Sequence, residues 1–585
     1  MIGTYAAVLA ICAASLAIGQ AAIGLFGERF GIGLAGRRRW SWLAPPVGLA
    51  VLCWICWWTV QLPGDGLVSA ALVLVLTVGS VAYLRGRTEG AGEAWRAGWP
   101  IALGALLAAS LPFAVEGHFG ILGTSFNPDM SQHLLAADRL SEGQPSQLLN
   151  QGYPLGPHSI VVALNKGLGI GLVQGFGGLT IAVAVLACLT VLAAFGELPA
   201  IPRTAGALLV GLAYAVAAYF AQGAFKETMQ ALFLLAFVLA LREANGDWRG
   251  FQLRFMPAAF IALGSVYAYS FPGLIWLGAA LVFWLVVEAL RGQVGGETIR
   301  GLAIAGFYFV VLAVPEVDRM LDFHSFETFD PNGPGLGNLF GQISPFEALG
   351  IWPSGDFRLA PGDGAIPAAG YYLGVAFALA LFLYGLLQLW RRRETAILAG
   401  VGAAALAYAA ARVAGTPYTA AKAVEIASPL VALTILLPLL RETGRVSEPG
   451  GRKTALRPLG PLAAAGIFVA AAGVCSLLTL ANAPVGPTSY SSKLSEYRKA
   501  VGEGPTLLVA PPQLLEEEHG EPFLTWELRG GRVCIKSTED PEAPPGTRFV
   551  IRDEEGWILK KVKPRPGKSP CPLVAERQAR QGPAR

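Results

Sequence analysis

The sequence predicts an all-α polytopic membrane protein with a small α/β domain at its C-terminal end. Of the 585 residues, 54% are hydrophobic and only 14% are charged, whereas about 25% of the residues in an average soluble domain are charged. About 13 to 14 apolar segments approach or reach the roughly 20 residues that cross a bilayer. From residue 483 onward these segments stop and charged residues become frequent, which indicates a separate soluble domain.

The predicted spans divide the chain into four regions. Residues 1–115 form the first membrane helices, residues 116–175 a first extracytoplasmic loop, residues 176–482 a membrane core, and residues 483–585 an extracytoplasmic domain. A second long loop, 316–370, interrupts the core, and the short apolar run 158–170 is predicted to lie on the membrane surface. The spans are predicted at 4–27, 43–61, 67–84, 99–115, 176–196, 204–220, 227–242, 255–270, 273–290, 300–315, 370–390, 396–412, 423–440 and 460–481.

Basic residues occur in alternate connections between these spans. They gather at 37–39, 85–96, 242–254, 391–393 and 441–457. Because cytoplasmic loops carry an excess of Lys and Arg, we expect both termini and both long loops on the outer face. Arg, Ala and Gly are abundant, which is typical of a bacterial protein, so the predicted location is the bacterial plasma membrane.

The C-terminal domain contains five short runs typical of strands, bounded by Gly and Pro. They lie at 506–511, 523–528, 532–537, 548–553 and 557–562. Cys534 and Cys571 lie on the oxidising side, where they either form a disulfide or remain two free thiols. Cys53 and Cys56 form a C-x-x-C within an apolar run, so packing is their expected purpose.

The first long loop is the most polar interruption of the membrane part, and it holds three of the five histidines. Polar groups at the mouth of a membrane bundle indicate function, although a solvated loop is the simpler interpretation. Asn127 and Pro128 are a helix-initiating pair, which places Asp129 in a first helical turn with His133 on the same face. A carboxylate there can accept a proton, or it can simply cap the helix.

Three further segments bring polar side chains to the same side of the membrane. GYPLGPH (152–158) closes the first loop and carries Tyr153 and His158, and GAFKE (223–227) ends in Lys226 and Glu227 at a helix mouth. TPYTAAKAVEIASP (416–429) contributes Tyr418, Lys422 and Glu425. Together they predict a carboxylate base surrounded by cations that bind a phosphate group.

With these motifs the chain resembles the GT-C superfamily of bacterial membrane glycosyltransferases, which use polyprenyl-phosphate-linked sugars. NPDM-SQH resembles the family's Asp-x-x-x-His pattern, YPLGPHSIVVALNKGLG its surface helix, and TPYTAAK a further family segment. The sequence departs from the family in two respects. The key loop follows the fourth predicted helix instead of the first, and no adjacent acidic pair lies near Asp129.

The resemblance implies transfer of a sugar to a cell-envelope glycan or lipid acceptor, by inverting displacement at the anomeric carbon. Asp129 would then act as the general base, and His133 would orient the acceptor or the donor phosphate. Lys226, Arg319 and Lys422 are the cations expected at the leaving phosphate. Arg319 has an alternative, which is an ion pair with Glu316 or Asp322.

The remaining binding candidates are Glu116, Tyr153, His158, Glu227 and Tyr418, with Glu116 also an alternative or assisting carboxylate. The expected partners are the polyprenyl-phosphate sugar donor, the acceptor and membrane lipids, with no nucleic acid. No metal or cofactor is expected, because His and carboxylate residues are spread along the chain. A divalent cation at Asp129 and Glu116 is the alternative.

Three other functions compete with this one. A transporter or lipid flippase would place ionisable residues and broken helices near the bilayer midplane, and the YAYSFPG segment (267–273) is compatible with that. A polysaccharide polymerase or ligase would use external arginines and a histidine, for which Arg319, His324 and Arg358 are candidates. A noncatalytic scaffold that binds cell-wall glycan is the third.

Overall fold

The structure is a computed structural model, in which most of the chain is described. It describes residues 1–29, 38–124, 126–127, 129–143, 147–246, 252–324, 335–444, 459–486, 492–516, 520–553 and 556–571. Several segments that the sequence analysis covers lie outside these residues, namely the basic positions Arg37, Arg249 and 445–457, part of the second long loop, and the chain beyond residue 571.

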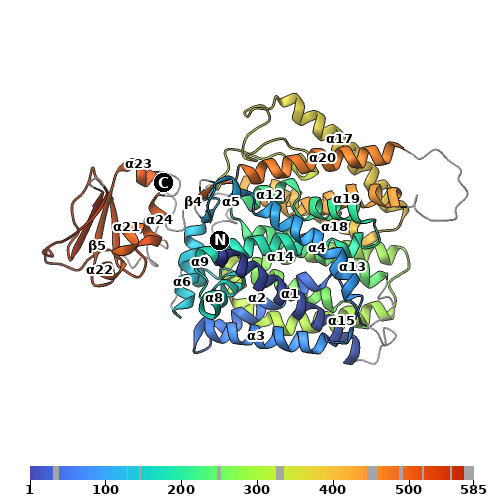
Figure 1. Ribbon diagram of the computed structural model, residues 1–585, viewed down its shortest axis with the longest axis horizontal. Helices are drawn as coiled ribbons and strands as arrows, with labels where there is room; N and C mark the ends of the chain where they lie inside the picture. Colours follow the sequence, from blue (N-terminus) through green and yellow to red (C-terminus); the bar gives the residue numbers. More distant parts are fainter. Residues whose placement is uncertain are drawn as a thin grey trace, which may run out of the picture.

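The long helices lie side by side across the view in Figure 1, and the C-terminal domain protrudes from one end of them. The first helices are α1 (Ile2–Arg29), α2 (Ala44–Val60), α3 (Asp65–Leu84), α4 (Ala91–Ala109), α5 (Leu111–Val115), α6 (Asp129–Ser141), α7 (Gln147–Asn150) and α8 (Gly156–Leu168). The membrane core then contains α9 (Leu172–Thr190), α10 (Leu192–Phe195), α11 (Ala200–Gly211), α12 (Tyr214–Ala221), α13 (Phe225–Asn245), α14 (Met256–Leu290), α15 (Gly296–Ala313), α16 (Val317–His324), α17 (Ala368–Arg391), α18 (Thr395–Ala414), α19 (Pro417–Gly444) and α20 (Leu459–Ala481).

Nine helices in the described ranges are long and apolar enough to cross a membrane, or ten if the bent pair α11 and α12 counts as one span. The protein is therefore a multi-pass membrane protein, as predicted. Several predicted spans do not qualify by themselves. Helix α2 has only 17 residues, whereas α4 and α13 carry charged side chains near their ends. Each of them packs against a helix that does qualify, α2 against α1, α4 against α9 and α13 against α14.

Helix α14 contains a sharp break at Ser270, whose φ is 62° and ψ −155°. The Phe255 and Trp284 rings lie 5.8 Å apart, although a straight helix would separate them by roughly 1.5 Å per residue. The chain therefore folds back at Ser270. This position separates the two segments predicted at 255–270 and 273–290, so the YAYSFPG turn lies between two helical arms.

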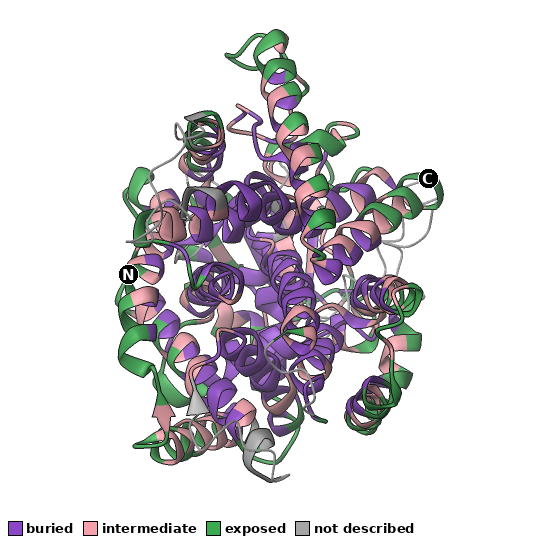
Figure 2. Cartoon of the chain, turned by 90° about the vertical axis from the view of Figure 1, so that its right-hand side faces the viewer, coloured by how far each residue is buried: buried purple, intermediate pink, exposed green. Residues whose placement is uncertain are grey.

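Burial separates a central group of helices from a peripheral one. The apolar windows of α19 and of α9 with α10 are 100% and 94% buried within the protein, whereas only 6% of the α3 window is buried. Figure 2 shows buried helices at the centre of the bundle and exposed ones around it. Helices such as α3 therefore face lipid, and the central helices can carry polar side chains shielded from it.

Helix α8 corresponds to the apolar run predicted to lie on the membrane surface. Residues 156–164, its first nine, are all buried inside the protein. The helix therefore packs within the protein along this half, because α2, α3, α6 and α9 all contact it.

The C-terminal domain is a four-stranded sheet with helices. Its strands are β5 (Thr506–Ala510), β6 (Val533–Ser537), β7 (Phe549–Asp553) and β8 (Trp557–Lys561), in the order β6-β5-β7-β8. Strand β5 is parallel to β6 and β7, whereas β7 and β8 are antiparallel. The helices are α21 (Ser492–Glu496), α22 (Arg498–Gly502), α23 (Pro512–Glu516) and α24 (Gly520–Glu527).

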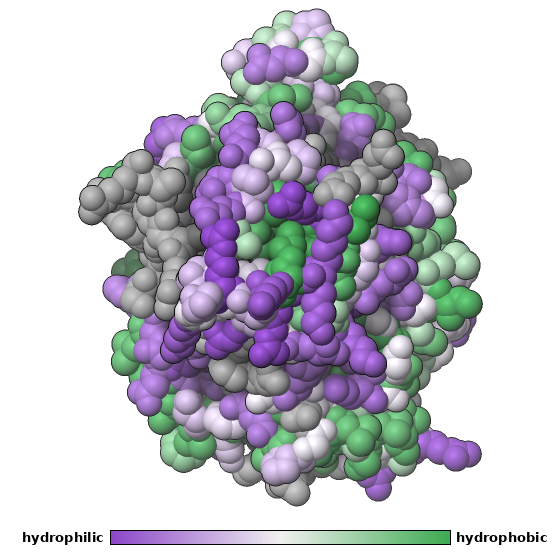
Figure 3. Space-filling model, turned by 90° about the vertical axis from the view of Figure 1, so that its left-hand side faces the viewer, coloured by the Kyte–Doolittle hydropathy of each residue, from purple (hydrophilic) through white to green (hydrophobic). Residues whose placement is uncertain are grey.

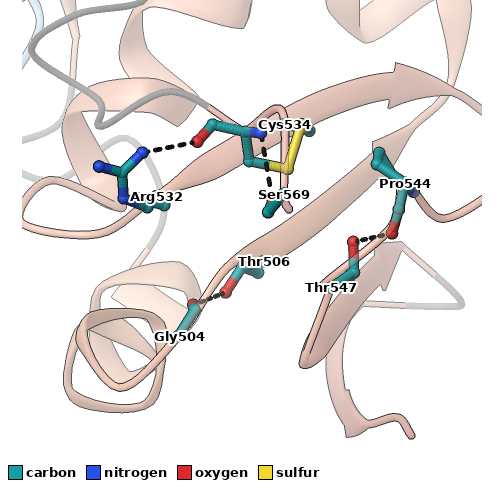
Figure 4. The surroundings of a disulfide bond; sticks show 8 residues. Gly504, Thr506, Arg532, Cys534, Pro544, Thr547 and Ser569 are labelled. Atoms are coloured by element: carbon teal, nitrogen blue, oxygen red, sulfur yellow. Dashed lines mark hydrogen bonds between the residues drawn. A yellow bond between two sulfur atoms is a disulfide. The ribbon is translucent and has the colours of Figure 1, made fainter. Parts of the chain in front are cut away.

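The strand predicted at 523–528 is wrong, because this segment forms most of helix α24. It connects the parallel strands β5 and β6, and such a connection must cross over the sheet, usually as a helix. The apolar side chains of Phe523, Leu524 and Trp526 are buried on this helix. A disulfide joins Cys534 of β6 to Cys571, which closes the domain at its C-terminal end (Figure 4).

Candidate active site

The first long loop is held in place before it reaches helix α6. Strand β3 (Ile121–Leu122) pairs antiparallel with β4 (Val485–Gly486), which follows the last membrane helix. Gly123 has a φ of +80°, and a Cβ there would lie 2.2 Å from the backbone carbon of Gln222. Only glycine fits so close to the end of α12. The backbone thus enters α6 from a fixed point.

Helix α6 begins at Asp129, as the Asn-Pro pair predicts. The Asn127 side-chain oxygen accepts a hydrogen bond of 2.9 Å from the Asp129 backbone N–H, which is a local cap that starts the helix. The Asp129 side chain is partly exposed, whereas His133 lies one turn later and is buried. The helix thus carries a partly exposed carboxyl in its first turn, at the N-terminal end of its buried side.

Lys422 and Glu227 form the ion pair at the centre of the site. The Lys422 ammonium lies 3.0 Å from the Glu227 carboxylate, with both side chains largely buried. Glu227 belongs to the first turn of α13, where a negative charge is favoured by the helix dipole. The ammonium also lies 4.3 Å from the centre of the Tyr418 ring, so the two predicted segments 223–227 and 416–429 meet.

Lys226 adds a second cation beside this pair. Its ammonium lies over the Tyr153 ring, 3.8 Å from the ring centre, a cation–π contact that offsets part of the cost of burial. Neither Lys226 nor Asp129 forms an ion pair with a described residue. Lys226 therefore keeps its capacity to donate hydrogen bonds to an anion.

The two buried histidines contact each other. His158 Nε2 lies 3.2 Å from His133 Nδ1, so one of these nitrogens carries the proton of a hydrogen bond between them. The rings of Phe176 and Phe225 enclose the pair. Burial lowers the pKa of both histidines well below the ordinary value, and for His133 the charges of Lys226 and Lys422 lower it further. Both rings are neutral at neutral pH and act as hydrogen-bonding groups.

Asp129 has the electrostatic surroundings of a base. Desolvation raises the pKa of its carboxyl above the ordinary value, although the ammonium groups of Lys422 and Lys226 and a hydrogen bond from Asn127 oppose this. Desolvation also raises the pKa of the Tyr153 phenol, which therefore stays protonated and can donate a hydrogen bond. A carboxylate of raised pKa accepts a proton more readily.

The residues described so far form one cluster, namely Asp129, His133, Tyr153, His158, Lys226, Glu227, Tyr418 and Lys422. Tyr269 and Tyr219 belong beside it and were missed in the sequence, whereas Glu425 lies in one of the predicted segments. Tyr269 lies just before the α14 break, with the Lys226 ammonium 6.0 Å from its ring. Glu425 is fully buried one turn below Lys422, and Tyr219 is fully buried on α12. The Glu425 carboxylate and the Tyr219 hydroxyl have no hydrogen-bond partner among the described residues. The YAYSFPG motif marks Tyr269 and the TPYTAAKAVE segment marks Glu425, whereas nothing in the sequence marks Tyr219.

Other predicted residues lie apart from the cluster. Glu116 is exposed, and its carboxylate forms no ion pair or hydrogen bond with the described cluster residues. This arrangement gives no support to a divalent cation held by Glu116 and Asp129. Within the described chain, no group of three or more His, Cys, Asp or Glu side chains is arranged to hold a metal ion.

Arg319 pairs with Glu316, which is the alternative considered for it in the sequence. Its guanidinium also donates a 3.0 Å hydrogen bond to the Gly152 carbonyl. Because Gly152 immediately precedes Tyr153, Arg319 holds the turn that presents this tyrosine. Arg358 is likewise paired, with Asp356 at 2.8 Å, and its guanidinium lies 4.4 Å from the Phe126 ring centre. Both arginines therefore support the loops around the site.

The comparisons with known proteins concern the fold. No protein family model matches the sequence, and no curated protein matches it. Among solved structures, the arabinofuranosyltransferase AftD from Mycobacteria, determined by single-particle cryo-EM, is similar with a TM-score of 0.51. The fold is therefore similar to that of this membrane protein. The similarity covers 77% of this chain but only 35% of the AftD chain, at 15% sequence identity, so it shows the fold alone.

Proposed function

We propose that this protein is a glycosyltransferase that acts on the outer face of the bacterial plasma membrane. It transfers a sugar from a polyprenyl-phosphate donor to a glycan or lipid acceptor of the cell envelope, with inversion. The observation that carries this proposal is the cluster itself. A half-buried carboxyl, Asp129, faces the charges of two largely buried lysines, Lys226 and Lys422, and Lys226 has no ion-pair partner among the described residues.

The arrangement suits displacement at an anomeric carbon. Asp129 accepts the proton of the acceptor hydroxyl, and the carbon–oxygen bond to the donor phosphate breaks as the new glycosidic bond forms. Negative charge then develops on the leaving phosphate, where Lys226 and Lys422 stabilise it. The neutral His133 and the Tyr153 phenol orient the reacting groups by hydrogen bonds. The polyprenyl chain remains in the bilayer throughout.

The two ends of the central helices support the outer placement of the site. The cluster lies at the first turns of α13 and α19, whereas Arg242 and Arg441 lie in their last turns. These two arginines share Glu394, at 2.8 and 2.7 Å. Because basic residues favour the cytoplasmic side, the cluster and the disulfide-bonded domain both belong outside. Figure 3 shows the end of the molecule from which the C-terminal domain protrudes, and the largely hydrophilic surface there is consistent with this.

The position of the cluster argues against two of the competing functions. Its members lie at helix ends instead of half-way along the spans, which argues against a transport site at the bilayer midplane. The paired state of Arg319 and Arg358 argues against a site built on free external arginines.

The experiment that tests the proposed function incubates the purified protein in nanodiscs with a panel of polyprenyl-phosphate sugars and an acceptor glycan. We expect release of polyprenyl phosphate and an inverted glycosidic bond; movement of the lipid across liposomes without transfer would contradict the proposal.

A further inference from the structure

Both flanks of helix α6 are bound by residues from the last part of the chain. Before the helix, the Gly123 N–H donates to the Pro484 carbonyl at 2.8 Å, and the Gly486 N–H donates to the Thr124 hydroxyl at 3.0 Å. These bonds extend the β3–β4 pairing. The segment that leads into the first turn of α6 is therefore tied to the connection between α20 and the C-terminal domain.

Near the other end of α6, the C-terminal domain makes an ion pair with the helix. The Arg529 guanidinium lies 3.3 Å from the Asp138 carboxylate, with 17% and 21% of the two side chains exposed. Asp138 belongs to the same helix as Asp129 and His133. Arg529 lies two residues after the end of α24, and α24 packs against α6.

Arg529 is held in its orientation before it reaches Asp138. Its guanidinium lies over the Trp526 ring, 4.4 Å from the centre, and donates a 3.0 Å hydrogen bond to the Trp526 carbonyl. Trp526 is itself buried in the domain. A side chain fixed in this way loses little conformational entropy on pairing, unlike the average surface arginine.

The opposite side of α6 packs on the membrane part, mainly on α8 and also on α9. In Figure 1 the helix lies between the membrane bundle and the C-terminal domain. A helix of 13 residues is short and stiff, so a constraint at Asp138 also limits where Asp129 and His133 can lie relative to Lys226.

We propose that the C-terminal domain positions the candidate base, and that Arg529 and Asp138 are the positioning residues through which it does so. This inference rests on the proposed function, because it assigns a purpose to the domain in the same reaction. Arg529 does not touch the substrate. It fixes α6 so that Asp129 reaches the acceptor hydroxyl at the correct distance, an effect on the chemical step rather than on donor binding.

The test uses the full-length protein in nanodiscs and two conservative variants, Arg529→Gln and Asp138→Asn. Each is expected to lower kcat by about 3- to 10-fold with little change in the donor KM, and the double variant is expected to be no worse than either single one. Hydrogen exchange of the α6 amides should rise in the same variants. Exchanging the charges, with Asp138→Arg and Arg529→Asp together, should restore part of both properties.

Glu542→Gln is the matched control, because it removes an ion pair of 2.6 Å with Arg565 that is exposed and lies within the same domain. It should change neither kcat nor α6 exchange. The proposal is overturned if Arg529→Gln and Asp138→Asn leave both properties unchanged, or if their effects add. An inactive wild type with altered α6 exchange in the variants would instead contradict the proposed function alone.

Discussion

Lys422 and Glu227 form a 3.0 Å ion pair that joins the N-terminal turns of α19 and α13. Both helices lie in the buried centre of the bundle, so the pair is the point where two distant polar segments become one site. Each charge of the pair also offsets part of the cost of burying the other. Asp129 and Lys226 lie around it without ion pairs to the described residues, which leaves a carboxyl and a cation for the substrate.

Removing one partner of this pair should destabilise the protein. Lys422→Met leaves the Glu227 carboxylate buried without its counter-charge, and such a loss costs about 3–5 kcal/mol. Lys422→Met combined with Glu227→Gln should recover much of this stability, because no charge is then left unpaired. Thermal unfolding in nanodiscs measures the effect. Equal stability of Lys422→Met and the wild type would show that the pair is not buried as described.

Lys226 should affect donor binding more than stability. Its ammonium contacts the Tyr153 ring but forms no ion pair with a described residue, so Lys226→Met leaves no carboxylate stranded. A hydrogen bond to a charged group contributes about 1.5–3 kcal/mol, which predicts a donor KM raised by about 10- to 100-fold. Lys166→Met, which changes an exposed lysine of α8, is the control. An unchanged KM would remove Lys226 from the phosphate site.

The histidine pair predicts how stability depends on pH. Burial depresses the folded-state pKa of His133 and His158 below the ordinary histidine value of about 6.5, so the unfolded chain binds more protons below that pH. Stability is therefore fully present above about pH 6.5 and is lost as the pH falls, by up to about 1.4 kcal/mol per pH unit for each histidine. His158→Gln should flatten this dependence in unfolding experiments between pH 7 and 5, whereas His118→Gln, at an exposed position, should not. A dependence of opposite sign would contradict the burial of the pair.

The disulfide between Cys534 and Cys571 should stabilise the C-terminal domain. Cys534 and Cys571 are separated by 37 residues, and closing a loop of that size stabilises a fold by roughly 2–4 kcal/mol. Cys534→Ser with Cys571→Ser should lower the free energy of unfolding of this domain. Hydrogen exchange measures this as a loss of amide protection in strand β5. The membrane helices should keep their protection. Unchanged β5 protection would show that the bond contributes nothing.

The local features of the site could be predicted from the sequence because they depend on neighbouring residues. The start of α6 follows from Asn127 beside Pro128, and the helix-mouth position of Lys226 follows from the polar GAFKE between apolar runs. In these cases the chemistry of a few adjacent residues determines the structure. The same holds for four of the five predicted strands.

Other features depend on contacts between distant segments, and these could not be read from the sequence. Nothing near Arg529 indicates that it pairs with Asp138, and nothing near Tyr219 indicates that it is buried within reach of the charge of Lys422. The helix at 523–528 follows from the parallel pairing of β5 with β6, since an apolar run this short is compatible with either helix or strand. For Arg319 the sequence left two roles open, a cation at the leaving phosphate or a partner of Glu316 or Asp322, and the fold shows the pairing with Glu316.

The most direct test of the account is the kcat of Asp129→Asn in the nanodisc transfer reaction. The amide keeps the size and the helix-capping geometry but cannot accept the proton, so kcat should fall by about 10²- to 10⁴-fold, with donor binding and unfolding temperature retained. Asp363→Asn, an exposed carboxylate of the second loop, should behave like the wild type. Full transfer activity in Asp129→Asn would contradict the assignment of Asp129 as the base.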